Sequence, residues 1–480
     1  MSLVKNSLLY IISTLSVKAA SFLLLPFYSY LVTPAEYGYV FVVSAFVSFM
    51  SIFMAFSLHG ALSRFYFDCE SKEEVRQLYS TIVLVIFLLS LSLSGSLFLL
   101  SNTLSEILNL PVKYFQYAVC ISFVSTFYNV VLSLLYSMQD AKRVSITSTV
   151  LGILGIVIQL SMVLLMENKS LAIIQTMMIN AVISFIMFCW YSIPYFTTPS
   201  VKLKKLKLYA KYSISQFPSD ISAWFVQLSD RLIINKYIGA FDAGIYGMAG
   251  QLGQVPQILF HSVNKAYAPF AFSKYKEYEA GDELALGDMA KSTTVVFSIL
   301  TGLIACIIVV SNNLIALLAR QYATVAIVLP FILFAIWIDC LRILFMYPLA
   351  YMVKFIKVKS IIWIIGAIMG VSLNLILIPR YSVYGACVSM IVAYSFTCFL
   401  ILYFAQRAIY INYDKRKLRL ILFVTVLFLF FYFIGDNLLA FAIKTMACMG
   451  YIYIVVFKCN NIDVKRLWQN FVLQILKIVS

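Results

Sequence analysis

Runs of about 20 apolar residues recur along the whole chain, and they limit the folds that it can adopt. Each run is long enough to cross the ~30 Å hydrocarbon core of a bilayer as a helix. Hydrophobic residues make up 62% of the 480 residues and charged residues 12%, whereas a soluble domain averages about 45–50% and 25%. The sequence therefore predicts an all-α, polytopic membrane protein.

The pattern predicts about fourteen transmembrane helices. Their expected ranges are 8–31, 39–62, 79–101, 114–137, 147–166, 171–193, 213–238, 244–266, 291–311, 323–349, 360–378, 384–405, 418–434 and 438–457. The first run follows only Lys5 and has no small-residue cleavage site, so we interpret it as a retained span.

Basic residues indicate how these helices cross the membrane. With the N-terminus inside, 27 of the 36 Lys and Arg residues fall in cytoplasmic segments and only 4 in external loops. Cytoplasmic loops of membrane proteins carry this excess. The sequence predicts a multi-pass membrane protein with both termini in the cytoplasm. The net charge of +16 is explained in this way, and nothing resembles a nucleic-acid-binding module.

The expected domains follow from the loops between spans. They are an N-terminal lobe of six spans (1–197), a basic cytoplasmic linker (198–212), a C-terminal lobe of six spans (213–406), accessory spans 13 and 14 (407–457) and a cytoplasmic amphipathic tail (458–480). We interpret spans 13 and 14, which have almost no polar content, as an appendage packed against one lobe.

An internal repeat supports the two lobes. Segments 31–68 and 238–274 share a short external turn with an acid (Glu36, Asp242), then a glycine (Gly38, Gly244) and a tyrosine, a span and an aromatic-rich exit, at an offset of about 205. Duplicated halves with a site between them are a transporter design.

These residues resemble a known family. TPAEYGYV at 33–40 with the exit at 63–66, and SDRLIINKYIGAFDAGIYGMAGQL at 229–252 with the exit at 266–270, are similar to bacterial Wzx-type polysaccharide repeat-unit flippases (O-antigen or capsule). That family belongs to the multidrug/oligosaccharidyl-lipid/polysaccharide exporter superfamily, with the multidrug and toxin (MATE) exporters and the lipid II flippases. The resemblance implies a MATE-like, two-lobed fold with a central cavity of alternating access. It also implies an undecaprenyl-pyrophosphate-linked oligosaccharide as the substrate.

The span at 213–238 carries the strongest polar constellation, which we call the polar stripe: Gln216, Asp220, Gln227 and Arg231. They fall within about 40° of one another on a helix, and charges inside a span usually face a bundle interior or a wet cavity. Arg231 offers a forked guanidinium suited to a pyrophosphate. Asp220 and Asp230 are candidates to hold Arg231 or to couple a cation or proton. A structural ion pair between Asp230 and Arg231 is the alternative.

Three further charged residues inside spans are candidates for the site. Lys18 is too deep in the first span to reach the interface easily, and we predict that it meets substrate, with pairing to a carboxylate as the alternative. Asp339 and Arg342 are spaced i, i+3 in the tenth span, which favours an internal ion pair over substrate contact. The candidate cavity therefore comprises Lys18, Asp220, Gln227, Asp230, Arg231, Asp339 and Arg342.

No enzyme signature is found. Nucleophile–base spacing and a phosphate-binding glycine loop are absent, and the nine cysteines have no metal-site spacing, so we expect neither a catalytic site, a cofactor nor a metal. We expect membrane lipids and a lipid-linked oligosaccharide as partners, with a polymerase and a chain-length regulator of the same pathway as further candidates. A MATE-like cation or drug antiporter remains an alternative, as does a membrane polymerase or acyltransferase of that pathway.

Overall fold

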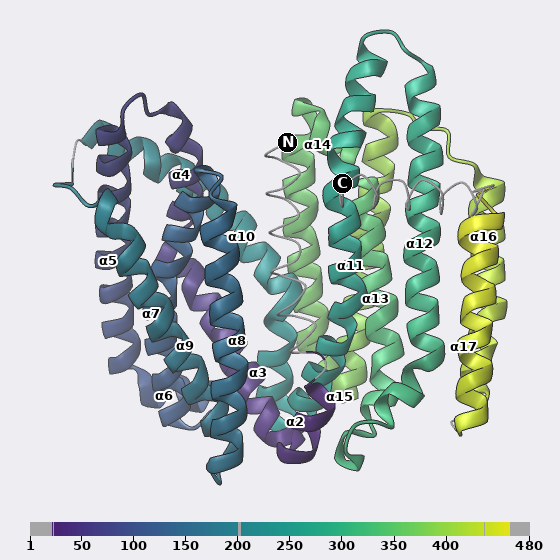
Figure 1. Cartoon of the computed structure of the whole chain (residues 1–480), viewed down its shortest axis with the longest axis horizontal. Helices are drawn as coiled ribbons and strands as arrows, with labels where there is room; N and C mark the ends of the chain where they lie inside the picture. The colour runs from purple at the N-terminus through teal and green to yellow at the C-terminus, as the bar shows by residue number, and fades with distance from the viewer. Residues whose placement is uncertain (1–21, 23, 200–202, 436, 461–480) are drawn as a thin grey trace, which may run out of the picture. The chain divides into compact units, whose positions relative to one another are not determined.

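The computed structural model describes residue 22 and residues 24–199, 203–435 and 437–460, which form helices joined by short turns (Figure 1). Within these residues there is no β-strand. The prediction of an all-α, polytopic membrane protein is confirmed.

The α-helices have the following bounds: α2 Leu25–Leu31, α3 Pro34–Ala55, α4 Leu58–Phe65, α5 Lys72–Leu99, α6 Ser101–Ile107, α7 Val112–Ser137, α8 Ala141–Leu165, α9 Lys169–Ser192, α10 Leu203–Tyr237, α11 Ala240–Glu279, α12 Leu284–Ile315, α13 Val325–Phe345, α14 Tyr347–Tyr351, α15 Ile356–Ala408, α16 Lys415–Leu429 and α17 Leu438–Ile452. Short 3₁₀ turns extend several of them, and a π-helical segment, η6 (Tyr453–Lys458), follows α17.

Predicted spans 2 to 14 all fall on helices. Nine helices in the described part of the chain are long and apolar enough to cross a membrane. One of these is α15, which contains both span 11 and span 12 and is broken at Ser382, where φ is 53° and ψ is −136°. Helices α10 and α11 are not among the nine, and they carry the charged stretch that begins at Gln216. Most of span 1 lies outside the described residues.

The second span is interrupted near its cytoplasmic end, where we expected a continuous helix over 39–62. Helix α3 ends at Ala55, and Phe56 and Ser57 adopt left-handed conformations with φ of 45° and 54° before α4 begins at Leu58. Non-glycine residues rarely adopt this conformation. The break changes the direction of the chain and lets the buried Ser57 side chain contact a neighbouring helix.

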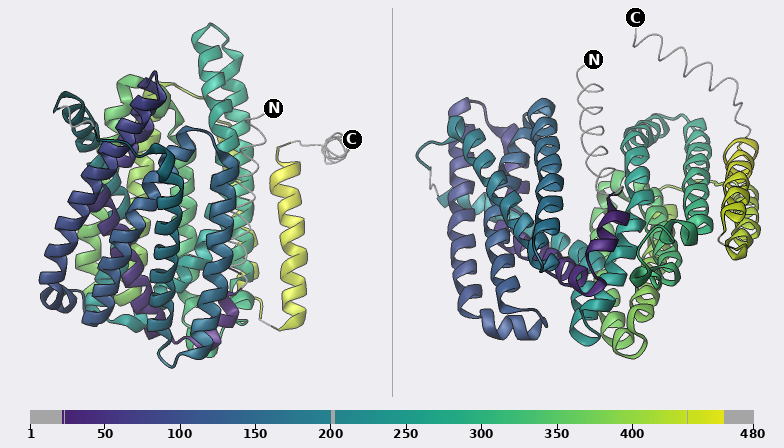
Figure 2. Two further views of the ribbon diagram at one scale, coloured as in Figure 1. Left: turned by 60° about the vertical axis from the view of Figure 1, so that its left-hand side comes forward. Right: turned by 60° about the horizontal axis from the view of Figure 1, so that its bottom comes forward.

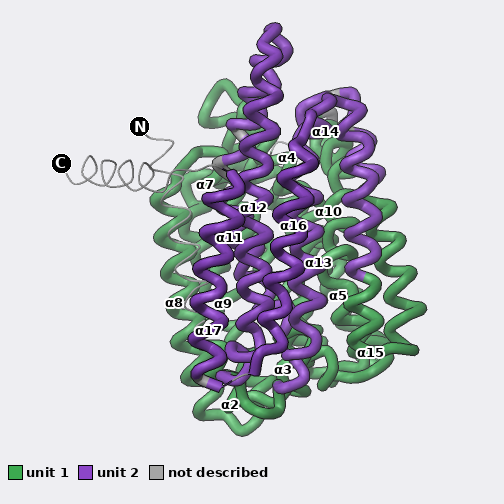
Figure 3. Tube along the Cα trace, turned by 90° about the vertical axis from the view of Figure 1, so that its right-hand side faces the viewer, with its two compact units in different colours: residues 1–248, 318–322, 363–389 green, residues 249–317, 323–362, 390–480 purple. Residues whose placement is uncertain are grey.

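Packing divides the chain into two compact units, shown in Figure 3. Unit 1 comprises residues 1–248, 318–322 and 363–389, and unit 2 comprises residues 249–317, 323–362 and 390–480. In unit 1, α10 packs against α3 and α4, while α7 packs against α3, α5 and α9. The lobe boundary at 198–212 stays a prediction, because these units record packing and a lobe is defined by helices that move together.

The repeat glycines form a reciprocal contact in unit 1. A Cβ placed on Gly38 of α3 would lie 1.8 Å from the carbonyl oxygen of Ala240, the first residue of α11. A Cβ placed on Gly244 of α11 would lie 1.8 Å from the carbonyl oxygen of Pro34, the first residue of α3. The two helices therefore cross with their backbones in contact, and each glycine occupies the equivalent place in its own repeat.

The repeat acids also occupy equivalent places. Glu36 closes a capping box at the start of α3 with Thr33, and its Oε1 accepts a hydrogen bond of 3.2 Å from the backbone N–H of Lys169, at the turn between spans 5 and 6. Asp242, in the first turn of α11, accepts a hydrogen bond of 3.4 Å from the Ser382 hydroxyl, at the turn between spans 11 and 12. Each acid thus connects its span to the turn between the last two spans of the same half, which the sequence predicts to be external.

Helices α16 and α17 form the accessory pair of unit 2. Both pack against α12, and they remain beside it in the views of Figure 2. Contrary to the expectation of almost no polar content, Lys444 of α17 is fully buried, and its Nζ lies 3.3 Å from Asn313 Oδ1 of α12. A lysine and an amide can share a buried hydrogen bond at lower cost than a lone charge.

Candidate functional site

The structure places six of the seven predicted site residues. Asp220, Gln227, Asp230 and Arg231 lie on α10 in unit 1, and Asp339 and Arg342 lie on α13 in unit 2. Lys18 lies outside the described residues, so its predicted role stays a prediction. We describe the two units separately.

Asp220 is held by two side chains. Its Oδ2 accepts a hydrogen bond of 2.7 Å from the hydroxyl of Ser57, and its Oδ1 accepts one of 3.1 Å from Nε2 of Gln216. Ser57 can reach it because of the left-handed break between α3 and α4. Two neutral donors leave the carboxylate charge unneutralised, which suits a group that exchanges a proton or cation.

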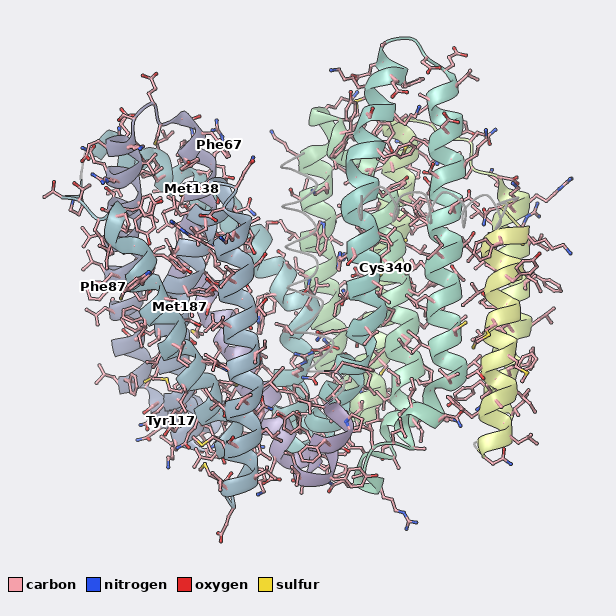
Figure 4. The ribbon with its side chains drawn as sticks, viewed as in Figure 1. Phe67, Phe87, Tyr117, Met138, Met187 and Cys340 are labelled. Carbon is pink, nitrogen blue, oxygen red and sulfur yellow. The ribbon has the colours of Figure 1, made fainter. Side chains whose placement is uncertain are left out.

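Asp220 and Gln216 line an open pocket of about 460 Å³ in unit 1. His59, Gly60, Ser63, Arg64, Phe67 and Tyr212 complete its lining. Phe67 lies at the end of unit 1 that the sequence places in the cytoplasm, away from Tyr117 (Figure 4). The guanidinium of Arg64 pairs with Asp68 at 2.8 Å, and both side chains are about half exposed. The pocket thus combines carboxylate, imidazole and guanidinium groups at the expected cytoplasmic mouth of α10.

Asp230 is buried, and its carboxylate accepts hydrogen bonds. Its side chain accepts a hydrogen bond of 2.5 Å from the Tyr246 hydroxyl of α11 and another of 2.8 Å from the backbone N–H of Arg231. Asp230 is 7% exposed and Tyr246 is 3% exposed. Tyrosine and carboxylate form a charge-assisted hydrogen bond, which is stronger than a neutral one. Asp230 therefore ties α10 to α11.

Arg231 is half-buried and lies over the ring of Phe41 on α3, with 5.7 Å between its guanidinium carbon and the ring centroid. Its Nε is buried without a hydrogen-bond partner in the described structure. The described residues also contain no salt bridge to Arg231 within 4.0 Å. The ring orients the guanidinium without neutralising its charge. Arg231 acts on Asp230 electrostatically, and the choice between a cavity role and an Asp230–Arg231 ion pair stays open.

The polar stripe has two ends. Asp220 and Arg231 are eleven residues apart, or about 16 Å along an α-helix, and Gln227 is exposed between them. One end holds an anionic pocket residue and the other an oriented cation. The predicted lining of a central cavity by these residues stays a prediction.

In unit 2, Asp339 and Arg342 form the predicted i, i+3 ion pair. They are 6% and 2% exposed, and the guanidinium carbon of Arg342 lies 5.3 Å from the centroid of the Tyr394 ring. Cys340, which follows Asp339 and is labelled in Figure 4, marks this level of α13. Because the pair is closed and buried, its geometry fits a structural role better than substrate contact.

The predicted site lacks several partners in these clusters, among them Ser57, Tyr246 and Phe41. Each is an ordinary hydroxyl or ring on a different helix from its partner, so sequence spacing carries no signal for it. The charged partners were found because charge is rare inside a span. No group of three or more His, Cys, Asp or Glu within the described ranges could hold a metal ion.

Comparison with solved structures defines the fold class. The chain is similar to the lipid II flippase MurJ in its inward closed conformation, with a TM-score of 0.73, 14% identity, and coverage of 93% of this chain and 98% of that one. It is also similar to an inward-facing multidrug resistance MATE family transporter of the MOP superfamily, with a TM-score of 0.62, 13% identity, and coverage of 84% and 94%. At this identity the likeness shows the fold alone, which this chain shares with these two proteins.

The family follows from the sequence. The chain matches the sequence model of the polysaccharide biosynthesis protein family over residues 3–276 and belongs to that family. Two curated Haemophilus influenzae proteins are similar to it: an uncharacterized membrane protein, 23% identical over 296 residues, and Lsg locus putative protein 1, 24% identical over 294. These matches cover 58% of this chain and 67% and 68% of those proteins. The resemblance to polysaccharide flippases is confirmed at the level of the family and fold.

Proposed function

We propose that this protein is a flippase that moves undecaprenyl-pyrophosphate-linked oligosaccharide repeat units across the bacterial plasma membrane. The units would serve the synthesis of O-antigen or another surface polysaccharide. The proposal rests on the family and fold together with one observation: Arg231 is a cation on a polar span, oriented by Phe41, with a buried Nε that has no hydrogen-bond partner among the described residues.

The charge on Arg231 fits an anionic head group. A guanidinium donates paired hydrogen bonds to phosphate oxygens, and such charge-assisted bonds are strong when they are partly desolvated. A pyrophosphate would supply the acceptors that the Nε of Arg231 lacks. Lys18 is the second candidate cation for this head group.

The cycle that we propose begins when the pyrophosphate-sugar enters from the cytoplasmic side while the polyprenyl tail remains in lipid. The lobes then rock and expose the sugar to the outer leaflet. A proton, a cation or the membrane potential resets the protein. Asp220 is the better coupling candidate, because Ser57 and Gln216 leave its charge unneutralised, whereas Asp230 is committed to Tyr246.

A cation or drug antiporter of the same fold is the second candidate. Such a protein needs an acidic cavity, and here the acid on α10 that is buried deepest is already hydrogen-bonded while the arginine beside it is not paired. That balance favours an anionic substrate over a cationic one.

Deletion of the gene followed by lipid analysis tests the function. We expect finished lipid-linked repeat units to accumulate on the inner leaflet, with surface glycan lost. Accumulation of exported but unpolymerised units would instead identify a polymerase. Unchanged lipid-linked units combined with drug sensitivity would identify an antiporter.

A further inference from the structure

One surface of unit 2 combines a basic pocket and an apolar groove. The pocket measures about 470 Å³ and is lined by residues from α12, from the segment before α16, from α16 and from the turn after η6: Gly287, Ala290, Lys291, Thr294, Val295, Asn412, Asp414, Lys417 and Asn460. The sequence places this end of each helix in the cytoplasm. None of these residues belongs to the candidate site on α10.

Positive charge dominates the pocket. Lys291 has a side chain that is 82% exposed, and its nearest carboxylate is Asp288 at 3.9 Å. Asp288 is shared with Lys274, whose Nζ lies 3.5 Å from it. Asp414 is engaged elsewhere, because its Oδ1 accepts the backbone N–H groups of Arg416 and Lys417 at 3.1 and 3.0 Å and so caps α16. The ammonium groups of Lys291 and Lys417 therefore remain available to an anion.

An apolar groove of about 120 Å³ lies further along the same helices. It is lined by Thr301, Ile304, Ala305, Ile308, Phe334, Trp337, Leu422, Thr425, Val426 and Leu429, from α12, α13 and α16.

The pocket and the groove follow one stripe of α12 and both border α16. On α16, Lys417 lines the pocket five residues before Leu422, where the groove begins, and on α12 the lining residues recur every three or four positions from Gly287 to Thr294 and from Thr301 to Ile308. Residues at that spacing lie on one face. At 1.5 Å per residue the groove begins about 10 Å beyond Thr294 and ends about 20 Å beyond it.

We propose that this surface binds an anionic phospholipid of the cytoplasmic leaflet, with its phosphate between Lys291 and Lys417 and an acyl chain between α12 and α16. The distances match half of the ~30 Å hydrocarbon core. Basic pockets between helices on the cytoplasmic side suit anionic head groups. The bound lipid would attach the accessory α16–α17 pair to α12, and this role does not depend on the proposed function.

The test uses the purified full-length protein in nanodiscs or detergent, with lipid binding measured by native mass spectrometry. Phosphatidylglycerol is the probe and phosphatidylcholine of the same chain length is the comparison. We expect phosphatidylglycerol to bind preferentially, and the K291Q/K417Q variant to bind it about tenfold more weakly. The K415Q/R419Q variant removes two exposed charges from the same helix end and should bind as the unmodified protein does.

A second variant separates the head group from the chain. Val426→Trp fills the apolar groove and should weaken the binding of long-chain phosphatidylglycerol, while a dihexanoyl form still binds. Equal binding of the two lipids would overturn the proposal, as would equal losses in both charge variants. Competition by inorganic phosphate alone, with no effect of Val426→Trp, would also overturn it, because the site would then bind phosphate rather than lipid.

Discussion

At the scale of single residues, the charged side chains inside spans differ in their hydrogen-bond and ion-pair partners. Asp230 and Asp339 are buried and have partners, whereas Arg231 is oriented by a ring and retains its charge. Burial of a charge is tolerated only when it is paired or hydrogen-bonded. We therefore propose that the first two residues serve structure and that Arg231 meets a ligand.

Tyr246→Phe should destabilise the protein by about 1–3 kcal/mol, because it leaves the buried carboxylate of Asp230 without its donor. The thermal midpoint of the detergent-solubilised protein measures this loss. Tyr351→Phe is a matched control, since its hydroxyl bonds to exposed Glu279. An unchanged midpoint in Tyr246→Phe would show that the hydrogen bond to Asp230 contributes nothing to stability.

Asp339→Ala should destabilise the protein by about 3–5 kcal/mol, because it removes the carboxylate that pairs with the buried Arg342 charge. The double variant Asp339→Leu with Arg342→Met replaces the pair by apolar groups and should recover most of the lost protein level. Transport per molecule should then be close to normal. If the double variant is abundant but inactive, the pair contacts substrate and its structural interpretation is wrong.

Residue identity allowed part of the site to be predicted. Asp220, Asp230 and Arg231 stood out because charge is rare within a span, and the Asp339–Arg342 pair followed from i, i+3 spacing. The partners Ser57 and Tyr246 were not predictable, because they come from other helices. Ser57 also depends on a left-handed break that its sequence does not mark.

At the scale of helices, the repeat has a physical explanation. Only glycine fits at Gly38 and Gly244, because a carbonyl oxygen of the opposite helix lies where the Cβ of any other residue would be. The repeat was visible in the sequence, but the contact between its two copies was not. Hydrophobic periodicity placed the spans well. It missed the break at Phe56 and the extension of helices beyond the predicted spans, such as α11 to Glu279.

Gly38→Ala and Gly244→Ala should each destabilise the protein by about 1–3 kcal/mol or more, because a Cβ at 1.8 Å from backbone forces the helices apart. Gly95→Ala is the control, since nothing lies within 4 Å of its Cβ position on α5, and alanine there favours the helix by about 0.5–1 kcal/mol. Thermal midpoints compare the three. Equal midpoints for Gly38→Ala and Gly95→Ala would contradict the close crossing of α3 and α11.

At the scale of the whole molecule, the direction of insertion rests on the distribution of basic residues. Lys113, before the fourth span, is predicted to be external, and Lys415, at the start of α16, to be cytoplasmic; both are exposed. In a cysteine-free background, Lys113→Cys should react with an impermeant maleimide in intact cells, and Lys415→Cys should react only after permeabilisation. The reverse pattern would invert the orientation and with it the direction of transport.

The central claim is that the protein moves lipid-linked oligosaccharides and that Arg231 binds their phosphate. The most direct measurement is translocation of an undecaprenyl-pyrophosphate-linked oligosaccharide in proteoliposomes that contain equal amounts of each variant. The unmodified protein and Lys236→Ala, an exposed cation on the same helix, should translocate it at similar rates, and Arg231→Ala should be about tenfold slower or worse. Translocation by Arg231→Ala at the unmodified rate would contradict the role of Arg231, and no translocation by the unmodified protein would contradict the function.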